Sequence, residues 1–182
     1  MKKKSLIIGI TGSIAAYKIP QMARDLHVQG YDVTAVLTEN AQKFVTPWTL
    51  ESLTGNPCFS DMFYLKSKTL FPHIEISKKA KLLVIAPATA NFIAKVSYGI
   101  ADDLLSTLFL SCTCPKLIAP AMNKRMFENY QTQDNIKKLK KKGVFFMNVA
   151  TGLLACGEQG SGRMSDIKNI AKKIQTFLKK NG

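Results

Sequence analysis

Acidic residues are scarce in this sequence. Asp and Glu number 12 against 26 Lys and Arg, which gives a formal net charge of +14. Long apolar runs are also missing, because the apolar run around residues 104–115 contains serine and threonine, and no uncharged run in the sequence is long enough to span a bilayer. The apolar stretch after the N-terminal lysines ends at Gly9, too early for the core of a signal peptide. We therefore expect a cytoplasmic protein that does not enter a membrane.

Cysteine is too sparse for a disulfide framework. The 4 cysteines are Cys58, Cys112, Cys114 and Cys156, and no two of them form a C-x-x-C pair. The spacing of Cys112 and Cys114 is not a usual zinc arrangement either. These patterns predict free thiols in a reducing compartment and no metal site.

Signals for nucleic-acid recognition are absent as well, although the positive charge would suit a polyanion. Much of the charge lies in two lysine clusters, within residues 137–142 and 172–180, on segments with helical periodicity. No RNA-binding aromatic motif or helix-turn-helix pattern accompanies them. We interpret both clusters as solvated helix faces and expect no nucleic-acid partner.

What the sequence does contain is an alternation of apolar strands and helices within 182 residues, of which 46% are hydrophobic. This length fits one domain, and we expect residues 1–182 to form it. Apolar runs predict strands at residues 5–10, 31–37, 81–86, 116–119 and 143–148. Helical spacing predicts helices at residues 14–29, 46–53, 90–96, 102–112, 129–142 and 167–179. This alternation predicts an α/β fold, a doubly wound parallel sheet in a Rossmann-like three-layer sandwich.

Three details of this pattern are less regular. Pro20 is expected to kink the first helix or to mark its first turn, and Gly30 to end it. His27, inside that helix, is interpreted as a surface residue. Residues 59–79 form the least regular segment of the chain.

Polar or small residues follow each of the first four predicted strands. They are Gly12-Ser13, Thr38-Glu39-Asn40, residues 87–91 and residues 120–123. Because ligands of doubly wound sheets bind at the carboxyl ends of the strands, we expect the functional site at this edge.

The turn from Gly9 to Ile14 leads from the first strand into the first helix. Gly12 permits a tight turn, and Ser13 can cap a helix whose free N–H groups attract a phosphate. The turn lacks the third glycine of a dinucleotide fingerprint and the Gly-Lys-Ser/Thr of a Walker loop. It either merely connects a strand to a helix or binds the phosphate of a mononucleotide, with help from Thr38 or Thr89.

Four dispersed segments add a more specific signal: GSIAAYK at 12–18, APATANF at 86–92, PAMNKRMF at 120–127 and ACGEQGSGRM at 155–164. In order and spacing they resemble the homo-oligomeric flavin-containing cysteine decarboxylases, over nearly the whole chain. Thr89 stands where that family has serine and keeps its hydroxyl. The chain departs from the pattern at Phe92 in place of threonine, Phe127 in place of tryptophan and Glu158 in place of aspartate.

The resemblance implies an FMN cofactor and three catalytic residues, His73, Asn123 and Cys156. Alone, these would be a structural histidine, a turn or cap asparagine and a small buried cysteine. In the family pattern, His73 exchanges a proton at the substrate thiol or carboxylate, and the Asn123 amide holds the departing carboxylate. Cys156, in a glycine-rich loop that can close over the site, donates a proton. The residues implied to bind FMN are Gly12, Ser13, Ile14, Thr38, Phe44, Thr89, Ala90, Asn91, Ser106, Ala121 and Met122.

The implied substrate is 4′-phosphopantothenoylcysteine, on the route to coenzyme A. Its carboxylate cannot leave directly, because no stabilised carbanion would remain. Hydride transfer from Cβ to the flavin gives a thioaldehyde that accepts the electrons as CO₂ leaves, and the reduced flavin then returns the hydride. The resemblance further implies a homo-oligomer, a trimer or a dodecamer of trimers, with each flavin near a subunit boundary. A separate phosphopantothenoylcysteine synthetase is expected as the partner enzyme.

Other functions stay open at this point. A lantibiotic-type peptidyl-cysteine decarboxylase shares the histidine and the Pro-x-Met-Asn motif, but generally lacks the Ala-Cys-Gly-Asp/Glu segment. A flavin prenyltransferase would not be expected to carry Pro-Ala-Met-Asn or Cys156. A non-catalytic flavoprotein that regulates a phosphatase need not keep His73 and Asn123, and usually has a long acidic tail.

Overall fold

The structure, a computed structural model, describes residues 4–62, 72–153, 157 and 159–180. Its centre is a six-stranded parallel sheet with the strand order β3-β2-β1-β4-β5-β6. The strands are β1 (Ser5–Ile10), β2 (Asp32–Leu37), β3 (Cys58–Phe59), β4 (Leu83–Ala88), β5 (Lys116–Pro120) and β6 (Phe145–Phe146). The chain winds outward from β1 in one direction and from β4 in the other, which confirms the predicted doubly wound topology.

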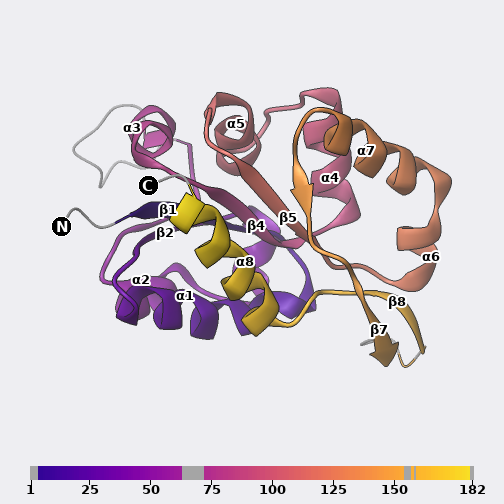
Figure 1. Cartoon of the computed structure of the whole chain (residues 1–182), viewed down its shortest axis with the longest axis horizontal. Helices are drawn as coiled ribbons and strands as arrows, with labels where there is room; N and C mark the ends of the chain where they lie inside the picture. The colour runs from indigo at the N-terminus through magenta and orange to yellow at the C-terminus, as the bar shows by residue number, and fades with distance from the viewer. Residues whose placement is uncertain (1–3, 63–71, 154–156, 158, 181–182) are drawn as a thin grey trace.

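Helices cover both faces of the sheet and complete the predicted three layers (Figure 1). One face carries α1 (Ile19–Val28), α2 (Pro47–Thr54) and α8 (Ile167–Lys180). The other carries α3 (Pro72–Lys79), α4 (Ala90–Tyr98), α5 (Leu104–Ser111) and α7 (Tyr130–Lys141). The short helices are η1 (Ile14–Lys18), η2 (Glu39–Lys43) and α6 (Lys124–Glu128). In the part of the chain that these elements describe, no helix has the length and apolarity needed to cross a membrane.

The central strands owe their position to unbroken apolar runs. Every residue of β4 is buried, and so is every residue of β1 after Ser5. A strand covered by helices on both faces needs apolar side chains at every position, not only at alternate ones. These two strands pair with each other from Ile7–Leu83 to Gly9–Ile85 and form the centre of the sheet.

The first predicted helix is a 3-10 turn, η1, followed directly by α1. Pro20 lies in the first turn of α1, where its missing N–H costs nothing, so it marks the start of that helix rather than a kink. Gly30 follows the last turn with φ +89°, a conformation that favours glycine. His27 is not fully at the surface: it is half-buried, and its Nδ1 atom is buried without a hydrogen-bond partner among the described residues.

Two segments differ from the sequence-based prediction. The stretch expected to be irregular ends in a regular helix, α3, and contributes the edge strand β3. The glycine-rich segment near the C-terminus includes an antiparallel hairpin, β7 (Ala150–Leu153) and β8 (Gln159–Arg163), which the sequence did not predict. In Figure 1 this hairpin extends away from the body of the sheet toward the side where α6 lies.

Candidate active site

The turns after β1 and β4 are joined at the point where the direction of winding reverses. The Thr11 hydroxyl donates to the Pro87 carbonyl at 2.8 Å and accepts from the Thr89 N–H at 3.0 Å. The Thr11 N–H also donates to the Pro87 carbonyl, at 3.2 Å. Thr11 was not predicted as a site residue, although a hydroxyl residue at the end of a buried strand, just before Gly12, is the signal that could have identified it. It holds the predicted phosphate-binding turn against the turn after β4, which carries Thr89.

Gly12 is required by close packing against the turn after β2. A Cβ atom at Gly12 would lie 2.5 Å from the Cβ of Asn40, which belongs to η2. The next residue, Ser13, caps η1, since its Oγ accepts from the Ala15 N–H at 3.4 Å. The turns after β1, β2 and β4 are thus held close together at one edge of the sheet, as the sequence predicted.

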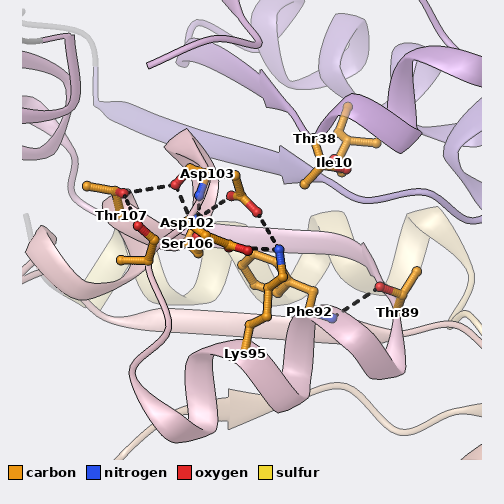
Figure 2. Close-up of polar contacts among 10 residues, drawn as sticks. Ile10, Thr38, Thr89, Phe92, Lys95, Asp102, Asp103, Ser106 and Thr107 are labelled. Atoms are coloured by element: carbon orange, nitrogen blue, oxygen red, sulfur yellow. Dashed lines mark hydrogen bonds and ion pairs between the residues drawn. The ribbon is translucent and has the colours of Figure 1, made fainter. Parts of the chain in front are cut away.

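Thr38 directly precedes η2, and its hydroxyl makes only one weak hydrogen bond. Its N–H donates to the Ile10 carbonyl at 3.0 Å, but its Oγ1 makes only a long bond of 3.5 Å to the same oxygen and does not cap η2 (Figure 2). Phe44, after the end of η2, is 42% exposed, and Ile14, in η1, is 53% exposed. Hydroxyl donors next to exposed apolar side chains fit a ligand with a phosphate at one end and a flat apolar ring at the other.

Thr89 caps α4, since its Oγ1 accepts from the Phe92 N–H at 3.3 Å. Ala90 is half-buried and Asn91 is exposed. Phe92, which departs from the family pattern, is buried in the core, where its ring meets the Phe109 ring edge-on at a centroid distance of 6.1 Å. At this position the chain therefore has no hydroxyl group, and the phenyl ring packs in the core instead.

A charged cluster ties α4 to the start of α5 (Figure 2). Lys95 Nζ lies 2.7 Å from Asp102 Oδ1 and 3.1 Å from Asp103 Oδ2. The hydrogen bond to Asp102 raises the pKa of Lys95, with Asp103 adding to the effect against partial burial. The same bond lowers the pKa of Asp102.

Ser106 belongs to the capping box of α5. Its N–H donates to Asp103 Oδ1 at 2.8 Å, while its Oγ accepts from the Asp103 N–H at 3.1 Å and donates to the Asp103 carbonyl at 3.0 Å. Ser106 is fully buried, and these bonds already engage its hydroxyl. Its contact with a flavin stays a prediction.

The turn after β5 joins the same edge. The Ala121 N–H donates to the Ala88 carbonyl at 2.9 Å, which links this turn to β4. Asn123 caps α6, with its Oδ1 accepting from the Met126 N–H at 2.8 Å. The cap fixes the orientation of the amide, and because Asn123 is exposed, its Nδ2 donors are available to an anion.

The β7–β8 hairpin packs directly on this turn. The Met122 N–H donates to the Gly162 carbonyl at 3.0 Å, and Ser161 Oγ donates to Glu128 Oε1 at 2.9 Å. Gly162 has φ +119°, and a Cβ there would lie 2.4 Å from the Met122 carbonyl oxygen. Only glycine allows this approach, which attaches the hairpin beside Asn123.

The side chains of two predicted catalytic residues lie outside the part of the chain that the structure describes. Cys156 lies outside the described residues, in the segment between the two arms of the hairpin. The backbone of His73 is in α3, but its side chain is outside the described part. Their roles stay predictions.

The chain belongs to the Flavoprotein family, whose model matches residues 1–179. A probable phosphopantothenoylcysteine decarboxylase of Streptococcus mutans is 38% identical over 177 residues, which cover 96% of this chain and 99% of that one. The coenzyme A biosynthesis bifunctional protein CoaBC of Haemophilus influenzae is 39% identical over 175 residues, 96% of this chain. The match covers only 44% of the bifunctional protein, so the chain spans less than half the length of that relative.

Solved structures of two related proteins have the same fold. A cysteine-to-serine mutant of PPC decarboxylase, complexed with pantothenoylaminoethenethiol, matches with a TM-score of 0.88 and 28% identity, over 98% of this chain and 100% of that one. The FMN-dependent cysteine decarboxylase SpaF matches with a TM-score of 0.81 and 30% identity, over 96% of this chain and 97% of that one. The predicted family resemblance is confirmed.

Proposed function

We propose that this chain decarboxylates 4′-phosphopantothenoylcysteine to 4′-phosphopantetheine, with FMN as its cofactor, in a single flavin-binding domain. The proposal rests on the observation that the turn after β4 is hydrogen-bonded to the turns after β1 and β5 at one edge of the sheet. We infer that this arrangement brings the hydroxyl and N–H groups proposed to bind a phosphate to the same edge of the sheet as the amide of Asn123. The name of the Streptococcus mutans relative, which the chain matches over almost its full length, supports the same substrate.

The FMN phosphate would be held by the backbone of Gly12 and by the hydroxyls of Ser13, Thr38 and Thr89. A carboxyl-edge turn that starts a helix offers free N–H groups to one phosphate, and a dinucleotide fingerprint is absent. Exposed Ile14 and Phe44 would supply apolar surface for the ring. Bound there, FMN would accept a hydride from the cysteine side chain and later return it.

The protein's own residues would then position the substrate and move its protons. The Asn123 amide, oriented by its cap on α6, binds the carboxylate until it departs as CO₂. His73 exchanges a proton at the thiol or the carboxylate, because an imidazole changes charge near neutral pH. Cys156 donates the proton that completes reduction of the enethiol. A cysteine-to-serine mutant of a structural neighbour is complexed with an aminoethenethiol, which is consistent with a cysteine acting at that last step.

The deciding experiment is mass spectrometry of the product after incubation with 4′-phosphopantothenoylcysteine. The expected product has lost CO₂ and nothing else, and the protein is yellow and releases FMN on denaturation. Release of FAD, or of no flavin, would contradict the cofactor assignment. An unchanged substrate mass with flavin-loaded protein would contradict the activity.

A peptidyl-cysteine decarboxylase is the second candidate, because the chain is 30% identical to SpaF, an FMN-dependent cysteine decarboxylase, and carries the histidine and the Pro-x-Met-Asn motif expected of the lantibiotic type. The same assay separates the two when a peptide ending in cysteine is offered in a parallel reaction. Loss of CO₂ from the peptide but not from 4′-phosphopantothenoylcysteine would replace the first proposal by the second.

A further inference from the structure

Thr11 carries a polar side chain that is buried at the centre of the site edge. It directly follows β1 and is 2% exposed. Its hydroxyl donates to the Pro87 carbonyl in β4 and accepts from the N–H of Thr89, the residue after β4. A hydroxyl has one proton to donate, and the proton of Thr11 is committed to Pro87. Thr11 therefore cannot itself donate a hydrogen bond to a ligand, although it lies between two turns that can.

The other hydroxyl groups at this edge keep their protons available. Ser13 and Thr89 each accept a bond from a backbone N–H of the helix that they cap (Figure 2 shows the bond to Thr89), and neither hydroxyl proton has an acceptor among the described residues. Thr38 donates only across 3.5 Å, to the Ile10 carbonyl. These three hydroxyls can bind a phosphate, whereas the hydroxyl of Thr11 can only hold the turns that carry them.

The N-terminus of α4 is the part of the site that Thr11 attaches to the turn after β1. The first backbone bond of this helix runs from the Ile93 N–H to the Thr89 carbonyl, at 3.0 Å. The N–H groups of Ala90 and Asn91 come before it and have no hydrogen-bond partner among the described residues. Such N–H groups attract a phosphate. The Thr89 N–H is different, because the Thr11 hydroxyl already accepts its bond.

We propose that Thr11 is a positioning residue for the FMN phosphate. Its two hydrogen bonds set the N-terminus of α4 against the turn after β1, so that both elements present their N–H and hydroxyl groups to one phosphate. This role rests on the proposed function, since it requires FMN at this edge. Without the hydroxyl, the Thr89 N–H loses its acceptor, but the Thr11 N–H still bonds to the Pro87 carbonyl at 3.2 Å. The two turns then stay connected but are no longer fixed relative to each other.

Competition between FMN and riboflavin, which lacks the phosphate, tests this role. Flavin-loaded protein is equilibrated with mixtures of the two, and chromatography of the released flavin gives the ratio of their affinities. Thr11→Val, which lacks the hydroxyl, should lower the preference for FMN about tenfold, as expected for the loss of a buried hydrogen bond. Thr11→Ser should keep the preference of the unaltered protein. An unchanged preference in Thr11→Val overturns the proposal, whereas an unaltered protein that binds neither flavin contradicts the cofactor assignment instead.

Thr54→Val is the matched control for a general loss of stability. Thr54 is 1% exposed, and its Oγ1 donates to the Leu50 carbonyl at 2.8 Å and accepts from the Asn56 N–H at 3.3 Å. It lies near the other edge of the sheet, since Asn56 Nδ2 donates to the carbonyl of Val33, close to the start of β2. Thr54→Val should lower the Tm as Thr11→Val does and keep the preference for FMN. An equal loss of preference in both variants would overturn the proposal.

Amide hydrogen exchange in the unaltered protein covers the case in which Thr11→Val does not fold. The N–H groups of Ala90 and Asn91 should exchange at least about tenfold more slowly with FMN bound than with riboflavin bound, because only FMN brings a phosphate that accepts from them. The Thr89 N–H should exchange at the same rate in both states, since its acceptor is Thr11. A Thr89 N–H that is protected only by FMN, or equal rates for Ala90 and Asn91 in the two states, would overturn the proposal.

Discussion

At the scale of single residues, Gly12 is a position where the packing leaves no room for a side chain. Gly12→Ala places a Cβ 2.5 Å from that of Asn40, so η2 and Thr38 must move away from the phosphate-binding turn. We expect a loss of about 1–3 kcal/mol in the free energy of unfolding and a markedly lower FMN content. Flavin absorbance per chain and thermal unfolding measure the two effects.

Gly55→Ala is the matched control. Gly55 has φ +68° and no atom within 4 Å of an added Cβ, so alanine there costs about 1–2 kcal/mol through the backbone alone. This variant should keep its flavin. If both variants lose flavin equally, the effect comes from general destabilisation, and the Gly12 turn has no special role.

The variants Cys156→Ser and Asn123→Asp should stop the reaction at different steps. Cys156→Ser keeps the groups that bind the carboxylate, but a hydroxyl is a far weaker acid than a thiol, whose pKa is about 8.5. This variant should release CO₂, accumulate a product two hydrogens lighter than 4′-phosphopantetheine and leave the flavin reduced. Asn123→Asp should release little or no CO₂, because a carboxylate would face the substrate carboxylate.

Product mass and flavin absorbance distinguish these outcomes, with Cys114→Ser as the cysteine control. Normal product at the wild-type rate from Cys156→Ser would mean that the thiol donates no proton in the reaction.

At the scale of helices and strands, the sequence predicted what depends on local pattern. β1 and α8 agree with the prediction to within a residue at each end, because buried strands and amphipathic helices have clear periodicities. β3, with two residues, has no periodicity to detect, and its pairing with β2 is a tertiary contact. The β7–β8 hairpin depends on the approach of Gly162 to Met122, which no local pattern encodes.

In the site too, some features could be predicted from the sequence pattern, whereas others depend on tertiary contacts. Gly12, Thr89 and Asn123 could be placed at one edge from the strand order alone, because parallel strands bring their carboxyl ends together. The role of Thr11 could not, since its two partners, Pro87 and Thr89, are distant in sequence and become neighbours only through the β1–β4 pairing.

The hairpin itself should control the second half of the reaction. In Gly162→Ala the Cβ would meet the Met122 carbonyl oxygen at 2.4 Å, and the backbone at φ +119° would be strained, so the hairpin must shift. Since Cys156 lies between the two arms, we expect the oxidised product to accumulate while CO₂ release continues. Product ratios measured by mass spectrometry test this expectation.

Gly160→Ala is the milder counterpart. Its Cβ would lie 2.7 Å from Cδ and 3.0 Å from Cβ of Lys124, which are side-chain atoms rather than a backbone carbonyl, so a smaller shift relieves the contact. It should give mostly normal product. The same product ratio from both variants would show that the attachment at Gly162 does not position the segment that carries Cys156.

The Lys95 cluster that joins α4 to α5 should show a defined pH dependence. The lowered pKa of Asp102 means that its stabilisation is present above the ordinary value of 3.8 and is lost as the pH falls below it. The raised pKa of Lys95 means that its stabilisation is present below the ordinary value of 10.5 and is lost at higher pH. Between these limits, Lys95→Met should cost about 1 kcal/mol or less, because the cluster is partly exposed to solvent.

Calorimetric Tm values of the two proteins at neutral pH and at about pH 3 measure the difference, which should shrink on acidification. Lys137→Met is the control, because Lys137 pairs with Asp134 at 3.5 Å with both side chains largely exposed. A Tm difference for Lys95→Met that is independent of pH would assign the effect to packing of the aliphatic chain.

At the scale of the whole molecule, we expect the proposed function to involve more than one chain. Large apolar side chains stand exposed on elements around the carboxyl edge, among them Ile14, Tyr17 and Trp48. Isolated exposed apolar residues are common, so these alone do not define an interface. Together with the family resemblance, however, they favour a homotrimer, or a dodecamer of trimers, in which each flavin site is completed by a neighbouring subunit.

Mixing two inactive variants tests this shared site directly. If His73 of one subunit serves the site that holds Asn123 of another, co-refolded His73→Asn and Asn123→Asp chains regain activity, because some sites combine the two unaltered residues. Random assortment in equal amounts gives about a quarter of the wild-type activity per site, since each contact draws its two chains independently. Each variant refolded alone should stay inactive, and sedimentation should give a multiple of the 20.1 kDa chain mass. Monomers at micromolar concentration would refute the oligomer, whereas trimers without recovered activity would place His73 and Asn123 of each site on one subunit.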